Sequence, residues 1–461
     1  MSDKGQKLRA IPGMDIILGY DWVKTWENKL GRLRVKRIIN QELAKIRTSI
    51  LENDEAEFIA DEFNKSCLGA FAFASRPSLQ QVINATGVVI HTNLGRSLIA
   101  GEAVDAMAQA AKSYTNLEYD LRAGKRGQRN SHVEDILCSI TGAEAALVVN
   151  NNAGAVMLAL SALAKDSEVV VSRGELVEIG GSFRIPDIME LSGAKLIETG
   201  TTNRTHLFDY ERAITPNTSM LLKVHPSNFR ITGFTASPER KDLAKLAHAN
   251  NLIFMEDAGS GLLIEGELIN LPSETNDITI KATLEAGADI VTFSGDKILG
   301  GPQIGGIVGK RVYVEKIKKH PMARALRVDK VTLAGFEATM RLYAKGCYDE
   351  IPTLKMLRLG NDKLKERAEN LAAKLSSIIN TEIINTKDAV GGGSCPEIAI
   401  DGWGVIIRSE LSASYIQKAL RNHDTPILCG AHDDDVIFHV RTLQYGDEEI
   451  IIAALEKILN A

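Results

Sequence analysis

The sequence predicts an α/β protein with a mostly parallel central sheet, a helical N-terminal domain and a small α+β C-terminal domain. From Val82 to about residue 345, short apolar strands alternate with helices and glycine turns, which is the pattern of βαβ units. Residues 1 to about 80 are polar with helical periodicity, and residues beyond 345 combine a long helix with short strands. The predicted domains are therefore 1–75, 76–345 and 346–461.

The N-terminal domain carries a local excess of positive charge. Helical periodicity runs from Trp22 to Leu51 and continues to Ala72. Residues 1–50 hold eleven Lys and Arg against five Asp and Glu, and five of the basic residues fall within Lys29–Arg37. Such a patch on a protein of net charge −5 can attract a polyanion, but a solvated helix face explains it equally well.

The overall composition is that of an ordinary globular protein, with 44% hydrophobic and 25% charged residues. Its five cysteines are widely separated and form no C-x-x-C motif, which argues against a disulfide framework and against a zinc site. No apolar run approaches membrane-spanning length, and Asp15 interrupts the only stretch resembling a signal peptide. We expect a cytoplasmic protein that uses no membrane and no metal.

The most informative stretch is Val291–Gly306. A short apolar strand, Ala288–Phe293, leads into small residues around a single lysine, Lys297. Glycines there let the backbone approach a flat ligand closely, and a lysine in such a place suits a Schiff base with pyridoxal phosphate (PLP). Ser294 is a candidate donor to the phosphate of PLP. A solvated loop lysine is the alternative for any lone lysine.

A second strand end supports the PLP interpretation. The apolar run that begins at Leu252 ends on Asp257, followed by small residues. PLP requires a carboxylate against its pyridine nitrogen, and a spacing of forty residues between Asp257 and Lys297 suits adjacent parallel strands joined by a helix. Taken alone, Asp257 would more often be a helix N-cap.

A phosphate site is expected where the strand ending near Val149 turns into an apolar helix. The backbone N–H groups from Asn151 through Ala153 to Gly154 begin that helix, and helix N-termini bind phosphate. The stretch lacks G-x-x-x-x-G-K-[ST] and so is not a nucleotide P-loop. Strand–turn–helix junctions are common, so this signal counts only together with Lys297 and Asp257.

Three arginines sit among apolar or small residues and suggest an oxyanion site. They are Arg96, Arg324 and Arg327, and the last two would share one face of a helix. Surface salt bridges are the alternative. The basic glycine loop Arg122–His132 either caps the active site, touches a polyanion or is a solvated turn. His432–Asp435 is expected to be a turn, because consecutive residues cannot all face one metal ion.

The C-terminal domain is predicted from one long helix and several short strands. The charged amphipathic helix spans Leu354–Ile379. The remaining predicted elements are strands Glu397–Ile400, Gly404–Arg408 and Val436–Arg441, and a closing helix, Asp447–Asn460.

Three long runs, Val82–Arg96, Ser172–Pro186 and Ser294–Gln303, strongly resemble the bacterial selenocysteine synthase family, the L-seryl-tRNA(Sec) selenium transferases. The resemblance implies the fold of a fold-type-I PLP-dependent transferase, similar to aspartate aminotransferase. It implies conversion of seryl-tRNA(Sec) to selenocysteinyl-tRNA(Sec), by β-elimination to dehydroalanyl-tRNA and addition of selenium from selenophosphate.

By the same resemblance, Lys297 would bond the cofactor, Asp257 would hold its ring nitrogen, and Arg96, Arg324 and Arg327 would bind an oxyanion. The family implies an N-terminal domain that grips the tRNA and a homo-oligomer, typically a decameric ring of dimers. No role is assigned to Cys395. The alternatives are a PLP lyase acting on a small amino acid or amino-sugar acid, and a catalytically silent tRNA-binding scaffold.

Overall fold

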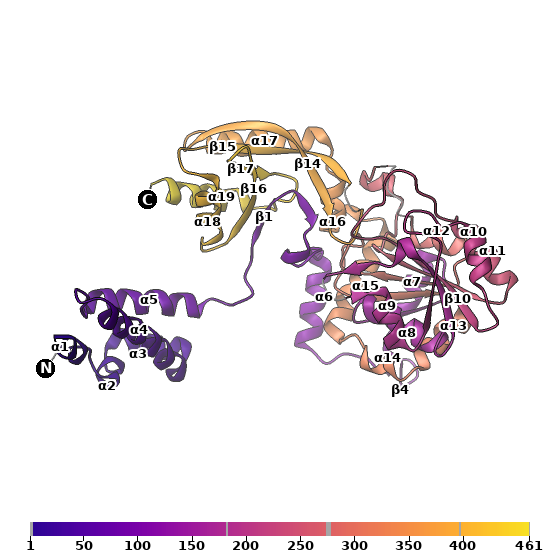
Figure 1. Ribbon diagram of the computed structural model, residues 1–461, viewed down its shortest axis with the longest axis horizontal. Helices are drawn as coiled ribbons and strands as arrows, with labels where there is room; N and C mark the ends of the chain where they lie inside the picture. Colours follow the sequence, from indigo (N-terminus) through magenta and orange to yellow (C-terminus); the bar gives the residue numbers. More distant parts are fainter. Residues whose placement is uncertain (1–2, 181–182, 273–277, 396–397, 461) are drawn as a thin grey trace. The chain divides into compact units, whose positions relative to one another are not determined.

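The computed structural model describes residues 3–180, 183–272, 278–395 and 398–460 (Figure 1). The chain forms two compact units, Met1–Gln81 and Val82–Ala461. No helix in these described ranges is long and apolar enough to cross a membrane.

The first unit is helical, as predicted. In α4, Val35, Ile39 and Leu43 recur every four residues, so they lie on one face and are buried. Gly31, with φ of 79°, ends the helix that precedes α4 and so divides the helical run predicted over 22–51. The helices are α1 (Asp3–Arg9), α2 (Met14–Leu18), α3 (Asp21–Leu30), α4 (Arg32–Glu52) and α5 (Ala60–Ser75).

The second unit contains a seven-stranded sheet of order β5-β13-β12-β11-β10-β6-β9. Only β13 runs antiparallel to its neighbours in this sheet of described residues, which confirms the expectation of a mostly parallel sheet. The strands are β5 (Ala145–Val149), β6 (Glu168–Ser172), β9 (Lys195–Thr199), β10 (Thr218–Val224), β11 (Ile253–Gly259), β12 (Ile290–Ser294) and β13 (Gly305–Gly309).

Helices cover both faces of this sheet because its strands are apolar on both sides (Figure 1). In β10, Leu221 packs into one core, whereas Met220 and Leu222 pack into the other. Helices α6 (Gly101–Lys112), α7 (Glu134–Thr141), α11 (Arg240–Ala249), α12 (Ile280–Glu285) and α15 (Lys330–Lys345) contribute to the first core. Helices α8 (Asn152–Leu163), α9 (Ile185–Ser192) and α13 (Arg311–Lys319) contribute to the second.

A second, six-stranded sheet combines strands from both ends of this unit. Its order is β1-β16-β17-β15-β14-β2, so two strands that precede the large sheet in sequence pair with strands that follow it. Ile83 lies opposite Ile427 in a parallel pair, a contact that crosses the predicted limits 76–345 and 346–461. The strands are β1 (Ile83–Ala85), β2 (Val88–Ile90), β14 (Asn380–Gly391), β15 (Ala399–Arg408), β16 (Ile427–His432) and β17 (Asp435–His439).

Several C-terminal elements differ from the predicted ones. The helix expected over 354–379 is divided by the extended backbone of Leu359 and Gly360 into α16 (Pro352–Arg358) and α17 (Asn361–Leu375). The two predicted strands over 397–408 are a single strand, β15, and Glu397 lies outside the described residues. The predicted closing helix is α19 (Asp447–Leu459), and α18 (Ala413–Arg421) packs against it.

The expected turn at His432–Asp435 is confirmed. His432 lies opposite Asp435 at the end of the β16–β17 hairpin. Asp433 and Asp434 both have positive φ, of 47° and 68°, as a tight two-residue hairpin turn requires. Among the described residues, no group of three or more His, Cys, Asp or Glu side chains is arranged to hold a metal ion.

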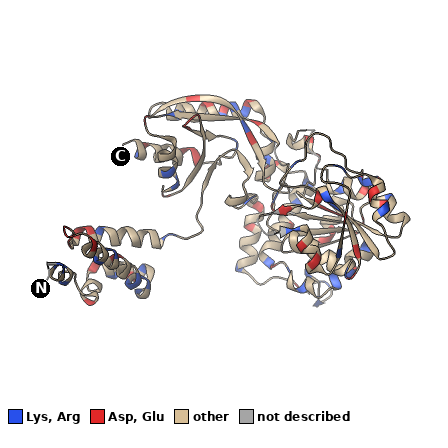
Figure 2. Ribbon diagram, in the orientation of Figure 1, with Lys and Arg blue, Asp and Glu red and all other residues tan. Residues whose placement is uncertain are grey.

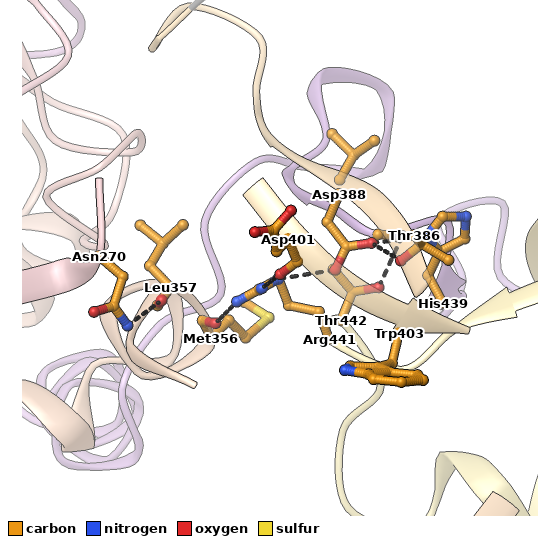
Figure 3. Close-up of polar contacts among 12 residues, drawn as sticks. Asn270, Met356, Leu357, Thr386, Asp388, Asp401, Trp403, His439, Arg441 and Thr442 are labelled. Atoms are coloured by element: carbon orange, nitrogen blue, oxygen red, sulfur yellow. Dashed lines mark hydrogen bonds and ion pairs between the residues drawn. The ribbon is translucent and has the colours of Figure 1, made fainter. Parts of the chain in front are cut away.

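A buried carboxylate, Asp388, anchors β14 (Figure 3). It accepts hydrogen bonds from Thr386 Oγ1 at 3.0 Å and Arg441 Nε at 2.9 Å, and His439 Nδ1 lies 2.7 Å from it. Arg441 also donates to the carbonyl oxygen of Met356 in α16, at 2.8 Å. The buried charge is thus paired and hydrogen-bonded, and it ties the six-stranded sheet to the helix beside it.

Candidate active site

The predicted lysine and aspartate lie at the ends of adjacent parallel strands. In the register of β11 with β12, Asp257 is opposite Thr292, and Lys297 follows β12 by three residues. Helix α12 lies between the two strands in sequence, which confirms the expected helical crossover. Both side chains are buried, with relative exposures of 5% for Asp257 and 6% for Lys297.

Asp257 is a carboxylate held in a dry but polar setting. Its Oδ1 accepts hydrogen bonds from Asn152 Nδ2 at 2.7 Å and Thr292 Oγ1 at 3.2 Å. Burial raises the pKa of Asp257, although these hydrogen bonds and the charge of Lys297 oppose the shift. The adjacent Glu256 has a different function, because both its oxygens accept from Arg240 Nε at 2.9 Å.

Lys297 is closely approached by backbone. A Cβ placed on Gly393 would lie 2.6 Å from Cε and 2.7 Å from Nζ of Lys297, and one on Gly259 would lie 3.9 Å from Nζ. Ser97 Oγ donates to the carbonyl oxygen of Lys297 at 2.5 Å, and Arg96 pairs with the preceding residue, Asp296, at 2.8 Å. Gly393 and Gly259 therefore bring backbone close to the Lys297 side chain.

The predicted phosphate turn adjoins the same strand ends. Asn151 caps α8, and its side chain accepts from Gly154 N at 2.8 Å, so one predicted amide donor is already engaged. Ser294 pairs in register with Gly305, and a Cβ on Gly305 would lie only 2.1 Å from the carbonyl oxygen of Asn151. The two predicted phosphate-binding groups, Ser294 and the start of α8 with Ala153, thus both adjoin Gly305.

Several buried polar atoms near the pair have no hydrogen-bond partner among the described residues. They are Asn152 Oδ1, Ser227 Oγ and Ser394 Oγ. Asn152 binds Asp257, Ser227 lies beside Gly259, and Ser394 follows Gly393. Buried polar groups without partners are costly, so they indicate a site that a polar ligand completes. Asn152 and Ser227, together with Asp257, Lys297 and the helix start, fit the polar groups of PLP.

Two known families match the chain that carries this geometry. Residues 82–444 match the family described as L-seryl-tRNA selenium transferase, and residues 8–47 match the family described as selenocysteine synthase N terminal. The chain belongs to the L-seryl-tRNA selenium transferase family.

Relatives within the L-seryl-tRNA selenium transferase family cover nearly the whole chain. A protein of Clostridium botulinum (strain 657 / Type Ba4) named L-seryl-tRNA(Sec) selenium transferase is 45% identical over 99% of this chain and 100% of its own length. A protein of the same name from Desulfotalea psychrophila is 50% identical over 90% of each chain. The resemblance inferred from the motifs is thereby confirmed.

A solved structure of D-glucosaminate-6-phosphate ammonia-lyase superposes with a TM-score of 0.60, at 22% identity, over 83% of this chain and 96% of that one. This likeness shows a shared fold. It agrees with the predicted α/β fold, with its mostly parallel central sheet.

Arg96 and Arg327 of this family member bind different carboxylates in the described chain. Arg96 pairs with Asp296, whereas Arg327 pairs with Glu118 at 3.4 Å, and Arg324 is exposed. The expectation that Arg324 and Arg327 share a helical face is wrong, because α14 (Met322–Ala325) ends before Arg327. Arg327 instead forms an isolated β-bridge with Val149, beside the phosphate turn.

The Arg122–His132 loop is partly ordered by its own hydrogen bonds. The strands β3 (Tyr119–Asp120) and β4 (Lys125–Arg126) pair at its start, and the Asp120 side chain accepts from the backbone of Arg122 and Ala123. Arg129 binds Glu118 at 3.1 Å, the same carboxylate that binds Arg327.

Sequence reasoning missed Asn152 and Ser394 at this site. The run of three asparagines before α8 was a signal for Asn152, but only the structure shows which of them reaches Asp257. Ser394 carried no local signal, because it reaches the site through the pairing of β14 with β2.

Proposed function

We propose that the chain is a PLP-dependent L-seryl-tRNA(Sec) selenium transferase in which Lys297 and Asp257 hold the cofactor. The reaction converts seryl-tRNA(Sec) to selenocysteinyl-tRNA(Sec), through dehydroalanyl-tRNA, with selenium supplied by selenophosphate. The observation that carries the assignment of residues is the buried pair at the ends of β11 and β12, in a chain that matches the family over 82–444.

The residues of the chain divide the work between them. PLP, when bound, supplies an electron sink for the charge that develops at Cα of the seryl group. Asp257 would accept a hydrogen bond from the protonated ring nitrogen. A cation beside the buried carboxylate lowers the free-energy cost of its negative charge. The Lys297 amine would remove the proton from Cα and deliver a proton to the departing hydroxyl. Its buried position excludes bulk water from that transfer.

Phosphate binding falls to the start of α8 and to Ser294. The N-terminus of this twelve-residue helix presents backbone N–H groups and the positive end of its dipole. Gly154 N is held by Asn151, so the neighbouring amide of Ala153 and the Ser294 hydroxyl are the donors we assign to the phosphate.

Selenophosphate binding is assigned to the arginines. The seryl carboxylate is an ester, so it needs no guanidinium partner, and arginines remain for a phosphate-like anion. Arg327 lies beside the phosphate turn, and Arg324 is exposed with no ion-pair partner among the described residues. Arg96 should contribute less to selenophosphate binding, since Asp296 already binds its guanidinium group.

The helical N-terminal unit is proposed to grip the tRNA. Lys29, Arg34, Lys36 and Arg37 are exposed at the end of α3 and along the start of α4. Figure 2 shows Lys and Arg positions in blue along the N-terminal helices. Arg34, Lys36 and Arg37 form no salt bridge with any described acidic residue, so their charge faces solvent. A polyanion of regular phosphate spacing is the partner that this charge suits.

Assembly and location complete the proposal. We propose a homo-oligomer, a decamer in the pattern implied by the family to which the chain belongs. A cytoplasmic location is supported by the five cysteines, which are odd in number and widely separated along the sequence.

The decisive experiment concerns Lys297. Purified protein with PLP should show an absorption band near the visible range that borohydride removes, and Lys297→Ala should lack the band and all conversion of seryl-tRNA(Sec). The matched control is Lys281→Ala, which removes an exposed lysine near Glu285 and should retain both. A wild-type protein that binds PLP but releases only small amino-acid products would favour a lyase instead.

A further inference from the structure

A glycine loop from the six-stranded sheet covers Lys297. The loop Gly391–Ser394 lies at the end of β14, and Gly393 approaches Lys297 so closely that a Cβ would meet Cε at 2.6 Å and Nζ at 2.7 Å. Gly393 also has φ of +81°, a conformation that side chains disfavour. The positive φ at position 393 therefore favours glycine, and the loop forms one wall of the site.

The loop is held in place by its neighbours. Gly392 N donates to the carbonyl oxygen of Ile90 at 3.2 Å, and Ser394 N donates to that of Gly391 at 3.3 Å. A Cβ on Gly392 would lie 2.5 Å from Thr92 Oγ1, so the segment after β2 and the loop are in contact. Three residues before Gly391, the buried Asp388 fixes the strand that carries the loop (Figure 3).

Ser394 is the polar group that this loop contributes. Its side chain is fully buried, and its Oγ has no hydrogen-bond partner among the described residues. A buried hydroxyl left without a partner destabilises the folded protein. Because Ser394 directly follows Gly393, which approaches Lys297, a ligand bound at this site is the candidate acceptor. A serine hydroxyl can donate one hydrogen bond, and a carbonyl oxygen is a suitable acceptor for it.

We propose that the Ser394 hydroxyl donates a hydrogen bond to the ester carbonyl of the seryl group in bound aminoacyl-tRNA. This inference rests on the proposed function. The seryl amine is committed to the cofactor and the seryl hydroxyl is the leaving group, so the ester carbonyl is the acceptor that remains. A hydrogen bond to this carbonyl oxygen also stabilises the negative charge that develops at Cα, from which Lys297 takes the proton. Ser394 is thus a substrate-binding residue that favours an ester.

The test compares two serines that differ only in their place. Ser394→Ala should lower kcat/KM for seryl-tRNA(Sec) roughly three- to tenfold, which is the loss of one neutral hydrogen bond. Ser161→Ala is the control, because Ser161 in α8 is also buried and its Oγ also lacks a partner in the described chain. The control should match wild type. Equal kcat/KM values for Ser394→Ala and wild type would overturn the inference.

A second readout uses binding alone. L-serine methyl ester and 2-amino-1,3-propanediol, which lacks the carbonyl, are titrated into PLP-loaded protein while the cofactor absorbance is followed. Wild type should bind the ester more tightly, and Ser394→Ala should lose that preference while keeping its PLP band and melting temperature. Loss of the band, or an equal weakening for both compounds, would assign Ser394 to holding the loop. The proposed function fails separately, if wild type forms no selenocysteinyl-tRNA.

Discussion

Asp257 shows at the scale of one residue how the site holds charge. The aspartate is placed at the end of a buried strand, where burial disfavours its ionised form and raises its pKa. Asn152 and Thr292 offset part of that cost through hydrogen bonds to Oδ1. A positively charged ring nitrogen would offset more of this free-energy cost. Cofactor binding would therefore stabilise the ionised form of Asp257.

The first prediction concerns Asp257→Asn in cofactor-free protein. Because the folded-state pKa is raised above the ordinary value of 3.8, the folded state binds the proton more tightly than the unfolded state does. Wild-type stability should therefore fall as pH rises from 3.8 to the raised pKa, by up to ~1.4 kcal/mol per pH unit, and the loss should persist above it.

Asparagine has no such proton, so the stability advantage of Asp257→Asn should be small at low pH and grow as pH rises. Thermal denaturation of both proteins between mildly acidic and neutral pH measures this difference. With PLP present the order should reverse, because the variant loses the ionic partner of the ring nitrogen. A difference that does not change with pH would show that Asp257 is not the buried acid inferred here.

At the scale of elements, the arginines depend on where a short helix stops. α14 ends at Ala325, and the chain then bridges to Val149 beside the phosphate turn. Arg327 therefore lies at the cofactor side of the sheet, where Glu118 binds it, while Arg324 remains exposed. The sequence spacing could not show that a helix ends between Arg324 and Arg327.

We predict that Arg324→Ala and Arg327→Ala each retain formation of dehydroalanyl-tRNA but convert it poorly to the selenium product. Removing one charge-assisted hydrogen bond to the donor anion costs about 1.5–3 kcal/mol, or roughly one to two decades in conversion. Lysine at either position should restore only part of the conversion, since it lacks the planar guanidinium group that binds two phosphate oxygens at once. Single-turnover assays that follow intermediate and product separately decide the matter.

Two outcomes sharpen the arginine experiment. Arg126→Ala removes an exposed arginine that binds the same Glu118 as Arg327, at 3.5 Å, and as a control it should leave both half-reactions unchanged. Elimination that falls as far as selenium transfer in Arg324→Ala or Arg327→Ala would instead place these arginines on the tRNA 3′ end or on the cofactor phosphate.

Elements defined by local sequence patterns could be predicted, whereas elements defined by pairing with distant parts of the sequence could not. Strands β11 and β12 and their crossover were recognisable, because buried parallel strands are continuous apolar runs with clear ends. β14 was not predicted, since its exposed and buried residues alternate only in part and its partners are distant in sequence. Ser394 reaches the site at the end of that strand, so the residue was missed with the element.

The whole molecule consists of two units with separate cores. Apolar side chains from α2, α3, α4 and α5 form a core of their own within residues 1–81, and the two sheets have theirs within 82–461. The proposed cofactor residues lie in the second unit, whereas the exposed basic helices lie in the first. Cofactor chemistry and tRNA affinity should therefore be separable by deletion.

The last prediction is that deleting residues 1–81 leaves the PLP spectrum intact and weakens tRNA binding by at least about tenfold, because ionic interactions with phosphates provide much of the affinity for nucleic acids. Wild-type affinity should fall steeply with salt, and the truncated protein should show a shallower dependence. Filter binding with tRNA(Sec) at several salt concentrations measures both.

A matched pair of double variants locates the tRNA-binding face within the first unit. Arg34 and Arg37 lie three residues apart on α4, hence on one face, and neither forms a salt bridge with a described acidic residue. Arg34→Ala with Arg37→Ala should weaken binding and reduce the salt slope by roughly two, because each arginine that binds a phosphate accounts for about one unit of the slope. Lys4→Ala with Lys24→Ala removes the same charge from residues already paired with Asp54 and Asp21, and should change little. If both pairs weaken binding equally, net charge attracts the tRNA and the α4 face makes no specific interaction with it; if neither does, the basic helices are a solvated surface and the tRNA is gripped elsewhere.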